Sequence, residues 1–413
     1  MEGCNMIRDK SSANEVFVKE KNQSQPFVDE LINENIIAKE EKSLIKDKLR
    51  EYGFFNEFFL FTIIITLISI VIYIVARYNS NFAEFFTRYP GSYLRAFLGY
   101  ITSFIPFSIA EAILILLPVF AIAYIVHSIT VMKKDARTSA FTKKLIPLIC
   151  VIMIMFSTFV ITFSTGYFRY PLEKNLNLVK NDVSVEDLRL VAIEINSELT
   201  ELEKDINFNF ESSSYMNYSF DSLVEKINIA FDDFASDYDF ISHFNSKPKQ
   251  VVLSVPMTYT QISGVFSFFT GEANININFP DYIQPFTVAH EMAHQRGISR
   301  EDEANLVAFL VCMRSDDSYI RYSGLLNINE YVLSALRKAS SNDYSQMYYS
   351  IPGSIRHELK AYSDFYNSYK NKTVSTVTKT INNTFLQSQG QTEGLKSYGM
   401  VVDLIVAYYK SID

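Results

Sequence analysis

Two of the five histidines in this 413-residue chain stand four positions apart, in the run His290-Glu291-Met292-Ala293-His294. On a helix, positions i and i+4 lie on one face, so both imidazoles can point at a single metal ion. Glu291 turns away from that face and can reach a water bound to the metal. This combination is typical of a hydrolytic zinc site. A solvent-facing helix that carries the three residues by chance is the alternative, and the scarcity of histidine argues against it.

The residues around this run predict a short helix and a sharp turn after it. Pro285 or Thr287 can begin the helix, and Gly297 can end it in the left-handed conformation. Ser299 and Asp302 have the spacing of a capping box, which predicts that a second helix begins directly after the turn. A third metal ligand can therefore come from the first turn of that second helix.

Two acidic residues in this turn are candidates for the third ligand. Glu301 and Asn305 share a helix face, so the Asn305 amide could orient a Glu301 carboxylate that binds zinc. Glu303 shares its face with Val307 and Leu310, which indicates a packed face. One of the two acids could be there only because the helix dipole favours negative charge at this end. The pattern favours Glu301 and leaves Glu303 as the alternative.

A peptide-hydrolysing zinc site also needs a hydrogen-bond donor for the developing oxyanion. Tyr322, His357 and Tyr398 are candidates. A tyrosine in a chain with 26 of them is more often a packing residue, and His357 lies in a pattern typical of a helix surface. Glu272 could bind the amino end of a substrate or cap a turn.

The composition excludes some classes of partner and site. The net charge of −8 argues against nucleic acid as a partner. Cys4, Cys150 and Cys312 lie far apart, in a polar tail, an apolar segment and a later helix. They predict neither a disulfide framework nor a metal cluster.

Three apolar segments are each about long enough to cross the roughly 30 Å of hydrocarbon in a bilayer. They run over residues 58–76, 109–132 and 145–163. We therefore expect a polar tail over residues 1–53, a membrane region over 54–164 and a single further domain over 165–413. The aromatic stretch over residues 82–107 could be a surface-lying helix or a re-entrant segment.

Basic residues predict the orientation of these segments. They cluster before the first segment and between the second and third, at Lys39, Lys42, Lys46, Lys48, Arg50, Lys133, Lys134, Arg137, Lys143 and Lys144. The positive-inside rule then puts the N-terminus in the cytoplasm and residues 165–413 on the extracytoplasmic side. The chain is thus expected to be a multi-pass protein of the cell membrane, with the histidine motif outside.

The pattern over residues 165–413 predicts an α-rich α+β domain with a small sheet. Helical spacing covers residues 183–205 and 220–234, and the region from Tyr319 onward is mainly helical, ending in a helix over residues 398–410. Strand-like composition covers residues 250–254, 264–270 and 274–278. An edge strand just before the histidine helix could hold an extended peptide by main-chain hydrogen bonds.

Several runs resemble a family of bacterial membrane proteins catalogued as domain of unknown function 3810. They are SGVFSFFTGEANININFP, PFTVAHEMAHQRGISREDEANLVAFLVC, YSGLL and GQTEGLKSYGMVVDL. The resemblance covers roughly Thr66 to the C-terminus and implies membrane spans followed by a zincin-like, gluzincin-type metallopeptidase domain. Glu301 to Asn305 is similar to the E-x-x-A-D element of membrane gluzincins, which implies that Glu301 is a ligand. Asn305 replaces the Asp of that element, and the gap from His294 is short, so Glu303 stays an alternative.

The sequence thus predicts a membrane-anchored zinc peptidase that cuts peptide or protein substrates outside the cell. His290, His294 and Glu301 would hold Zn²⁺, and Glu291 would take a proton from the attacking water. The alternatives are a membrane sensor with a zinc domain and a pseudo-peptidase with structural zinc. The intact Glu291 favours catalysis, since a structural site has no use for a base there.

Overall fold

The computed structural model describes residue 34 and residues 36–135, 138–209, 213–391 and 400–412. Contacts divide the chain into two compact units, which are described separately. The first unit joins Met1–Ile63 to Ala121–Val151, and the second joins Ile64–Phe120 to Ile152–Asp413. Tyr398, Cys4 and Arg137 lie outside the described residues.

Three helices are long and apolar enough to span a membrane, as predicted. They are α2 (Glu57–Tyr78), α5 (Ile109–Asp135) and α6 (Thr138–Thr162). Helix α6 begins earlier than the predicted residue 145, because its polar first turns also contain good helix formers such as Lys143 and Lys144. In the first unit, residues 36–51 are also helical, and the Thr62 hydroxyl lies 3.5 Å from Cys150 Sγ.

The aromatic stretch between α2 and α5 is an almost unbroken run of helix. It consists of α3 (Ser80–Phe86), a π-helical turn η1 (Thr87–Gly91) and α4 (Ser92–Thr102). Pro90 lies inside the π-helical turn. Proline has no backbone N–H to donate to the carbonyl four residues earlier, and a π-helical turn does not use that hydrogen bond.

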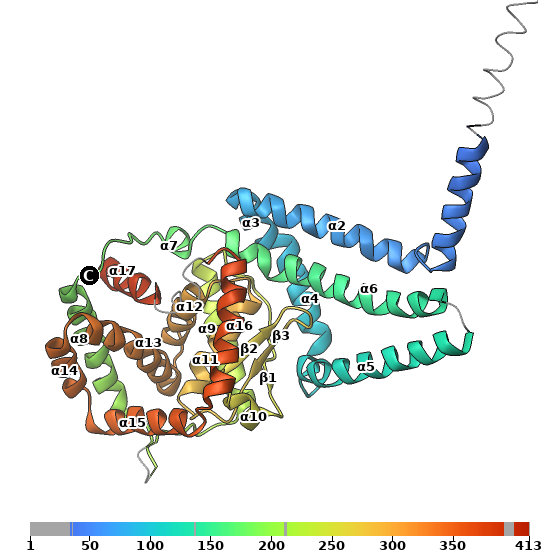
Figure 1. Ribbon diagram of the computed structural model, residues 1–413. Helices are drawn as coiled ribbons and strands as arrows, with labels where there is room; N and C mark the ends of the chain where they lie inside the picture. Colours follow the sequence, from blue (N-terminus) through green and yellow to red (C-terminus); the bar gives the residue numbers. More distant parts are fainter. Residues whose placement is uncertain (1–33, 35, 136–137, 210–212, 392–399, 413) are drawn as a thin grey trace, which may run out of the picture. The chain divides into compact units, whose positions relative to one another are not determined.

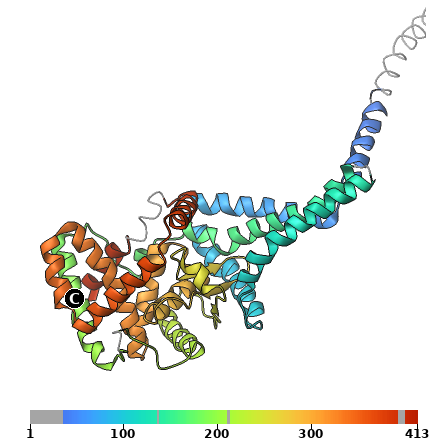
Figure 2. The same cartoon turned by 60° about the horizontal axis from the view of Figure 1, so that its bottom comes forward.

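The remainder of the second unit is rich in helix, as predicted. Its helices are η2 (Ser164–Phe168), α7 (Leu172–Asn175), α8 (Val185–Leu202), η3 (Glu203–Asp205), α9 (Phe220–Asp237), α10 (Ser254–Thr258), α11 (Ile283–Gln295), α12 (Glu301–Met313), α13 (Ser318–Ala339), α14 (Ser341–Ser350), α15 (Gly353–Ser368), α16 (Lys372–Ser388) and α17 (Val401–Ile412). Figures 1 and 2 show α11, α12 and α13 grouped together, with α8, α9 and α17 around them.

A sheet of three short strands lies against α11 (Figure 1). The strands β1 (Lys249–Gln250), β2 (Gly264–Ser267) and β3 (Glu272–Ile275) follow the order β1-β3-β2. Strand β1 runs parallel to β3, and β2 pairs antiparallel with it, so that Phe266 lies opposite Ala273. The prediction of a strand over residues 250–254 was largely wrong, because the chain turns there and enters α10. Strand β2 stands at an edge of the sheet.

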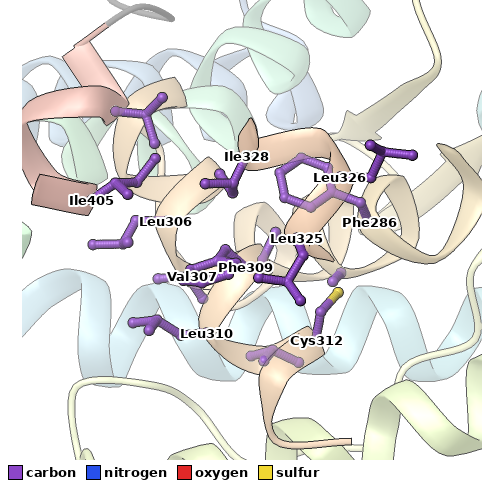
Figure 3. Close-up of a cluster of buried hydrophobic side chains, with 14 of the residues drawn as sticks. Phe286, Leu306, Val307, Phe309, Leu310, Cys312, Leu325, Leu326, Ile328 and Ile405 are labelled. Atoms are coloured by element: carbon purple, nitrogen blue, oxygen red, sulfur yellow. The ribbon is translucent and has the colours of Figure 1, made fainter. Parts of the chain in front are cut away.

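Apolar side chains of α11, α12, α13 and α17 form one buried core (Figure 3). The core residues labelled in the figure are Phe286, Leu306, Val307, Phe309, Leu310, Cys312, Leu325, Leu326, Ile328 and Ile405. Helix α8 adds Leu188, Val191, Ile195 and Leu199, whose spacing of three or four residues puts them on one face. This core fixes the positions of α11 and α12, the two helices that carry His290, His294 and Glu301.

A buried ion pair joins α3 to the segment that follows η2. The Arg169 guanidinium donates two hydrogen bonds to the Glu84 carboxylate, at 3.0 and 2.8 Å, and both side chains are buried. Arg169 also donates to the carbonyl oxygens of Gly297 and Phe240. Because the pair is enclosed, the loss of one partner leaves an uncompensated charge inside the protein.

We predict that Arg169→Leu lowers the thermal unfolding midpoint in detergent by several degrees, since breaking a buried pair costs about 3–5 kcal/mol. Arg189→Leu is the matched control, because Arg189 pairs with Glu186 on an exposed helix surface. Water screens an exposed pair, so this variant should unfold close to wild type. Equal shifts for the two variants would contradict the account.

Candidate metal centre

The two motif histidines lie on one face of α11 with their rings close together. The ring centroids of His290 and His294 are 4.6 Å apart, and the rings are nearly perpendicular. Helix α11 begins at Ile283, two residues before the predicted Pro285, and Gly297 follows it with φ +96°. The backbone N–H of Ile298 donates to the Ala293 carbonyl and closes the turn.

Helix α12 begins at Glu301 and brings this carboxylate back to the histidines. Glu301 Oε2 lies 3.3 Å from His290 Nε2 and 3.5 Å from His294 Nε2. In a tetrahedral zinc site with bonds of 2.0–2.1 Å, neighbouring ligand atoms lie about 3.4 Å apart. The two distances from Glu301 are close to this value, and all three potential ligand atoms lie within 4.8 Å of one another. All three side chains are largely buried.

Glu303 points to a different part of the structure. Its carboxylate accepts hydrogen bonds from the Leu172 backbone N–H at 2.9 Å and from Arg300 at 3.2 Å. Burial raises the pKa of Glu303 to about 7, although the Arg300 charge opposes this shift. The predicted capping box is absent from α12, because the Ser299 hydroxyl donates instead to the Phe163 carbonyl, and Arg300 occupies the N-cap position.

The two histidine rings differ in the hydrogen bonding of their Nδ1 atoms, and His294 has the second hydrogen bond typical of a metal ligand. His294 Nδ1 lies 2.6 Å from the Ile298 carbonyl oxygen. A proton on Nδ1 makes this hydrogen bond and leaves the lone pair of Nε2 free for a metal. His290 Nδ1 is buried and has no hydrogen-bond partner among the described residues.

Electrostatic effects among these groups are strong. Burial raises the pKa of Glu301, but the nearby His294 and His290 outweigh burial and hold it well below the usual range. Burial lowers the pKa of His294, yet the Glu301 carboxylate raises it to about 9. Without a metal, the carboxylate and His294 therefore act as an ion pair. A divalent cation bound by these atoms would replace that proton.

Glu291 lies beside the edge strand β2. The Phe266 backbone amide lies near enough to this carboxylate to lower its pKa, and the Oε2 atom of Glu291 is buried without a partner among the described residues. Burial raises the pKa of Glu291, against the effect of the two histidines. A side chain on Gly264 would place its Cβ 2.7 Å from Glu291 Oε1. Glycine at this position allows the strand to approach the carboxylate closely.

The remaining predicted site residues have other partners. The Tyr322 hydroxyl donates to the buried Glu358 carboxylate, and His357 is exposed on α15. The Asn305 amide donates to the Tyr331 hydroxyl at 3.4 Å, rather than to Glu301. Glu272 accepts from the backbone N–H groups of Ile109 and Ala110, so it caps the first turn of α5.

Tyr167 is near the site and was not predicted from the sequence. It lies in η2, directly after α6, and its ring packs 5.6 Å from Phe163, which packs 5.6 Å from His294. Its hydroxyl is buried without a partner among the described residues. In the sequence, Tyr167 is distinguished only by its position just after an apolar segment. The residues that the sequence offered as oxyanion donors, Tyr322, His357 and Tyr398, all follow the histidine motif.

Comparison with known proteins gives one match. A family model described as "Protein of unknown function (DUF3810)" matches residues 86–406 of the chain, which include every residue of this site. No curated protein matches the chain, and no solved structure matches it.

We predict that Glu301→Ala and Glu303→Ala differ in zinc binding. Loss of an outer-shell partner already weakens metal sites by about 10–100-fold, so loss of the Glu301 carboxylate should weaken zinc binding by at least about 100-fold. Glu303→Ala should keep its zinc and only unfold at a lower temperature, because Leu172 and Arg300 lose a partner. Chelator competition on the purified proteins measures both affinities. Equal zinc affinity in the two variants would exclude Glu301 as a ligand.

Proposed function

The chain belongs to the DUF3810 family of proteins of unknown function, and we propose that it is a membrane-anchored zinc metallopeptidase acting on the extracytoplasmic side. One observation carries this proposal. The potential ligand atoms of His290, His294 and Glu301 lie within 4.8 Å of one another in a largely buried cluster, next to a buried Glu291 carboxylate with an oxygen that no described residue binds. Two imidazoles and a carboxylate suit zinc, and three protein ligands leave a position open for catalysis.

The orientation rests on the basic residues and the three apolar helices. The described Lys39, Lys42, Lys46, Lys48 and Arg50 precede α2, and Lys133, Lys134, Lys143 and Lys144 lie around the connection between α5 and α6. The positive-inside rule supports a cytoplasmic N-terminus. Since α2, α5 and α6 are three in number, the residues after α6 are then outside the cell.

Each residue of the site has a distinct role in the proposed hydrolysis. Zinc held by His290, His294 and Glu301 supplies a Lewis acid that brings the pKa of a water close to neutral. Glu291 takes the proton from the attacking water and passes it to the leaving amine. The raised pKa of Glu291 makes its carboxylate a stronger base than an exposed glutamate.

Strand β2 and Tyr167 complete the proposed site. Strand β2 stands at an edge of the sheet beside Glu291, so an extended peptide can add to it by main-chain hydrogen bonds. The Tyr167 hydroxyl, which is buried without a partner among the described residues, donates to the oxyanion that forms at the scissile carbonyl.

We predict that Glu291→Gln keeps its zinc and loses peptide cleavage by about 10²–10⁴-fold, the usual contribution of a general base. Purified wild type and variant are compared in detergent for bound zinc and for cleavage of a peptide library. Retained zinc with wild-type cleavage would contradict the role of Glu291. Zinc binding by both proteins without any cleavage would favour the sensor or the pseudo-peptidase instead.

We predict that Tyr167→Phe lowers kcat by about 10²–10³-fold, the usual effect of losing one oxyanion donor, with zinc affinity unchanged. Tyr322→Phe is the matched control, because this tyrosine is equally buried but its hydroxyl donates to Glu358. We expect the control to lower the unfolding midpoint and to leave kcat close to wild type. If Tyr322→Phe alone lowers kcat, the oxyanion donor is Tyr322.

A further inference from the structure

Six large aromatic side chains form an exposed stripe along α3, η1 and α4 and into the turn after them. They recur every three or four residues, at Phe85, Tyr89, Tyr93, Phe97, Tyr100 and Phe104. Between 47% and 74% of each is exposed, and neighbouring rings contact each other at both ends of the stripe. Soluble proteins rarely expose a continuous apolar surface of this kind.

The opposite face of the same segment is polar and packs on the protein. Arg95 is fully buried and donates to the carbonyl oxygens of Gln295, Thr162 and Thr87, at 2.9, 3.1 and 2.8 Å. Gly99 lies so close to the body of the unit that a Cβ there would be 3.0 Å from the Gln295 amide. A helix on the surface of a soluble protein has the reverse arrangement, with charges outward and apolar groups inward.

Each charged side chain of residues 80–104 has a partner within the protein. Glu84 pairs with the buried Arg169, Arg88 pairs with Asp239 at 3.2 Å, and Arg95 is buried among carbonyl oxygens. The outward surface therefore consists mainly of aromatic rings and tyrosine hydroxyls. Tyrosine is enriched where membrane proteins meet the lipid headgroups, because its ring is apolar and its hydroxyl is polar.

The stripe lies level with the ends of the three apolar helices. Its segment begins directly after α2 ends at Tyr78, and Arg95 binds the carbonyl of Thr162, the last residue of α6. Helix α5 begins at Ile109, where Glu272 and the Ser108 hydroxyl accept its first backbone N–H groups. The free backbone N–H and C=O groups at the end of an apolar helix need polar partners. Where such partners are found, the hydrocarbon region of the bilayer gives way to the headgroup region.

We propose that the aromatic stripe is immersed in the headgroup region of the lipid bilayer, so that α3, η1 and α4 form an interfacial helix. Its continuity with the apolar helices favours lipid over a second copy of the chain. The buried face of this helix binds the end of α11 through Arg95 and Gln295, one residue beyond His294. The lipid surface and the metal centre are therefore joined by a single helix, whatever reaction the centre performs.

The absence of tryptophan from the chain provides a direct test. Phe97→Trp introduces one fluorophore in the stripe, and Tyr349→Trp introduces one on α14, where Tyr349 is 70% exposed. Each full-length variant is reconstituted into phosphatidylcholine vesicles with bromine either near the headgroup or near the end of the acyl chains. We expect blue-shifted emission from Trp at position 97, quenched most by bromine near the headgroup. The Trp at position 349 should emit as in water and stay unquenched.

Three results would overturn the proposal. Water-like, unquenched emission from position 97 shows that the stripe faces solvent. Blue-shifted emission that neither lipid quenches shows that protein, such as a second copy, covers it. Stronger quenching by bromine at the chain ends places the segment deep in the bilayer as a re-entrant element. Tyr100→Trp repeats the measurement at a second stripe position and guards against a local effect of one substitution.

Discussion

The carbonyl groups at the C-terminal end of α11 need hydrogen-bond donors, and two buried arginines provide them. Helix ends leave such carbonyls unpaired, and positive charge is favoured there. Arg95 donates to Gln295 and Arg169 donates to Gly297, both at the turn that joins α11 to α12. Both arginines come from segments next to the apolar helices, so the geometry of the centre depends on how these segments pack.

This arrangement holds the residues of the proposed site in place without a large sheet. The sheet contributes β2 beside Glu291, but its strands contain only two to four residues. Most of the support comes from the apolar core of α11, α12 and α13 and from the end of α6, where Phe163 contacts His294. The centre is thus built jointly by the helical domain and by residues at the end of an apolar helix.

Short-range patterns in the sequence predicted three features of the structure. The i and i+4 spacing puts the two histidines on one helix face, Gly297 allows the left-handed turn, and long apolar runs form the three apolar helices. Each of these effects depends only on residues that are close together in the sequence. The helix face favoured Glu301 over Glu303 without deciding between them, and only the structure shows that Glu301 lies beside His290 whereas Glu303 binds Leu172 and Arg300. Tyr167 was missed because it follows an apolar segment far from the histidine motif. Arg95 and Arg169 were missed, since Gln295 and Gly297, whose carbonyl groups they bind, lie 200 and 128 residues away in the sequence. No local pattern encodes such contacts.

The most direct test of the central claim is the zinc X-ray absorption spectrum of the purified protein loaded with one equivalent of zinc. The account predicts two imidazole nitrogens and one carboxylate oxygen at about 2.0–2.2 Å, with a light atom from solvent in the remaining position. Sulfur at about 2.3 Å, or zinc that is not retained with a stoichiometry of one, would contradict it.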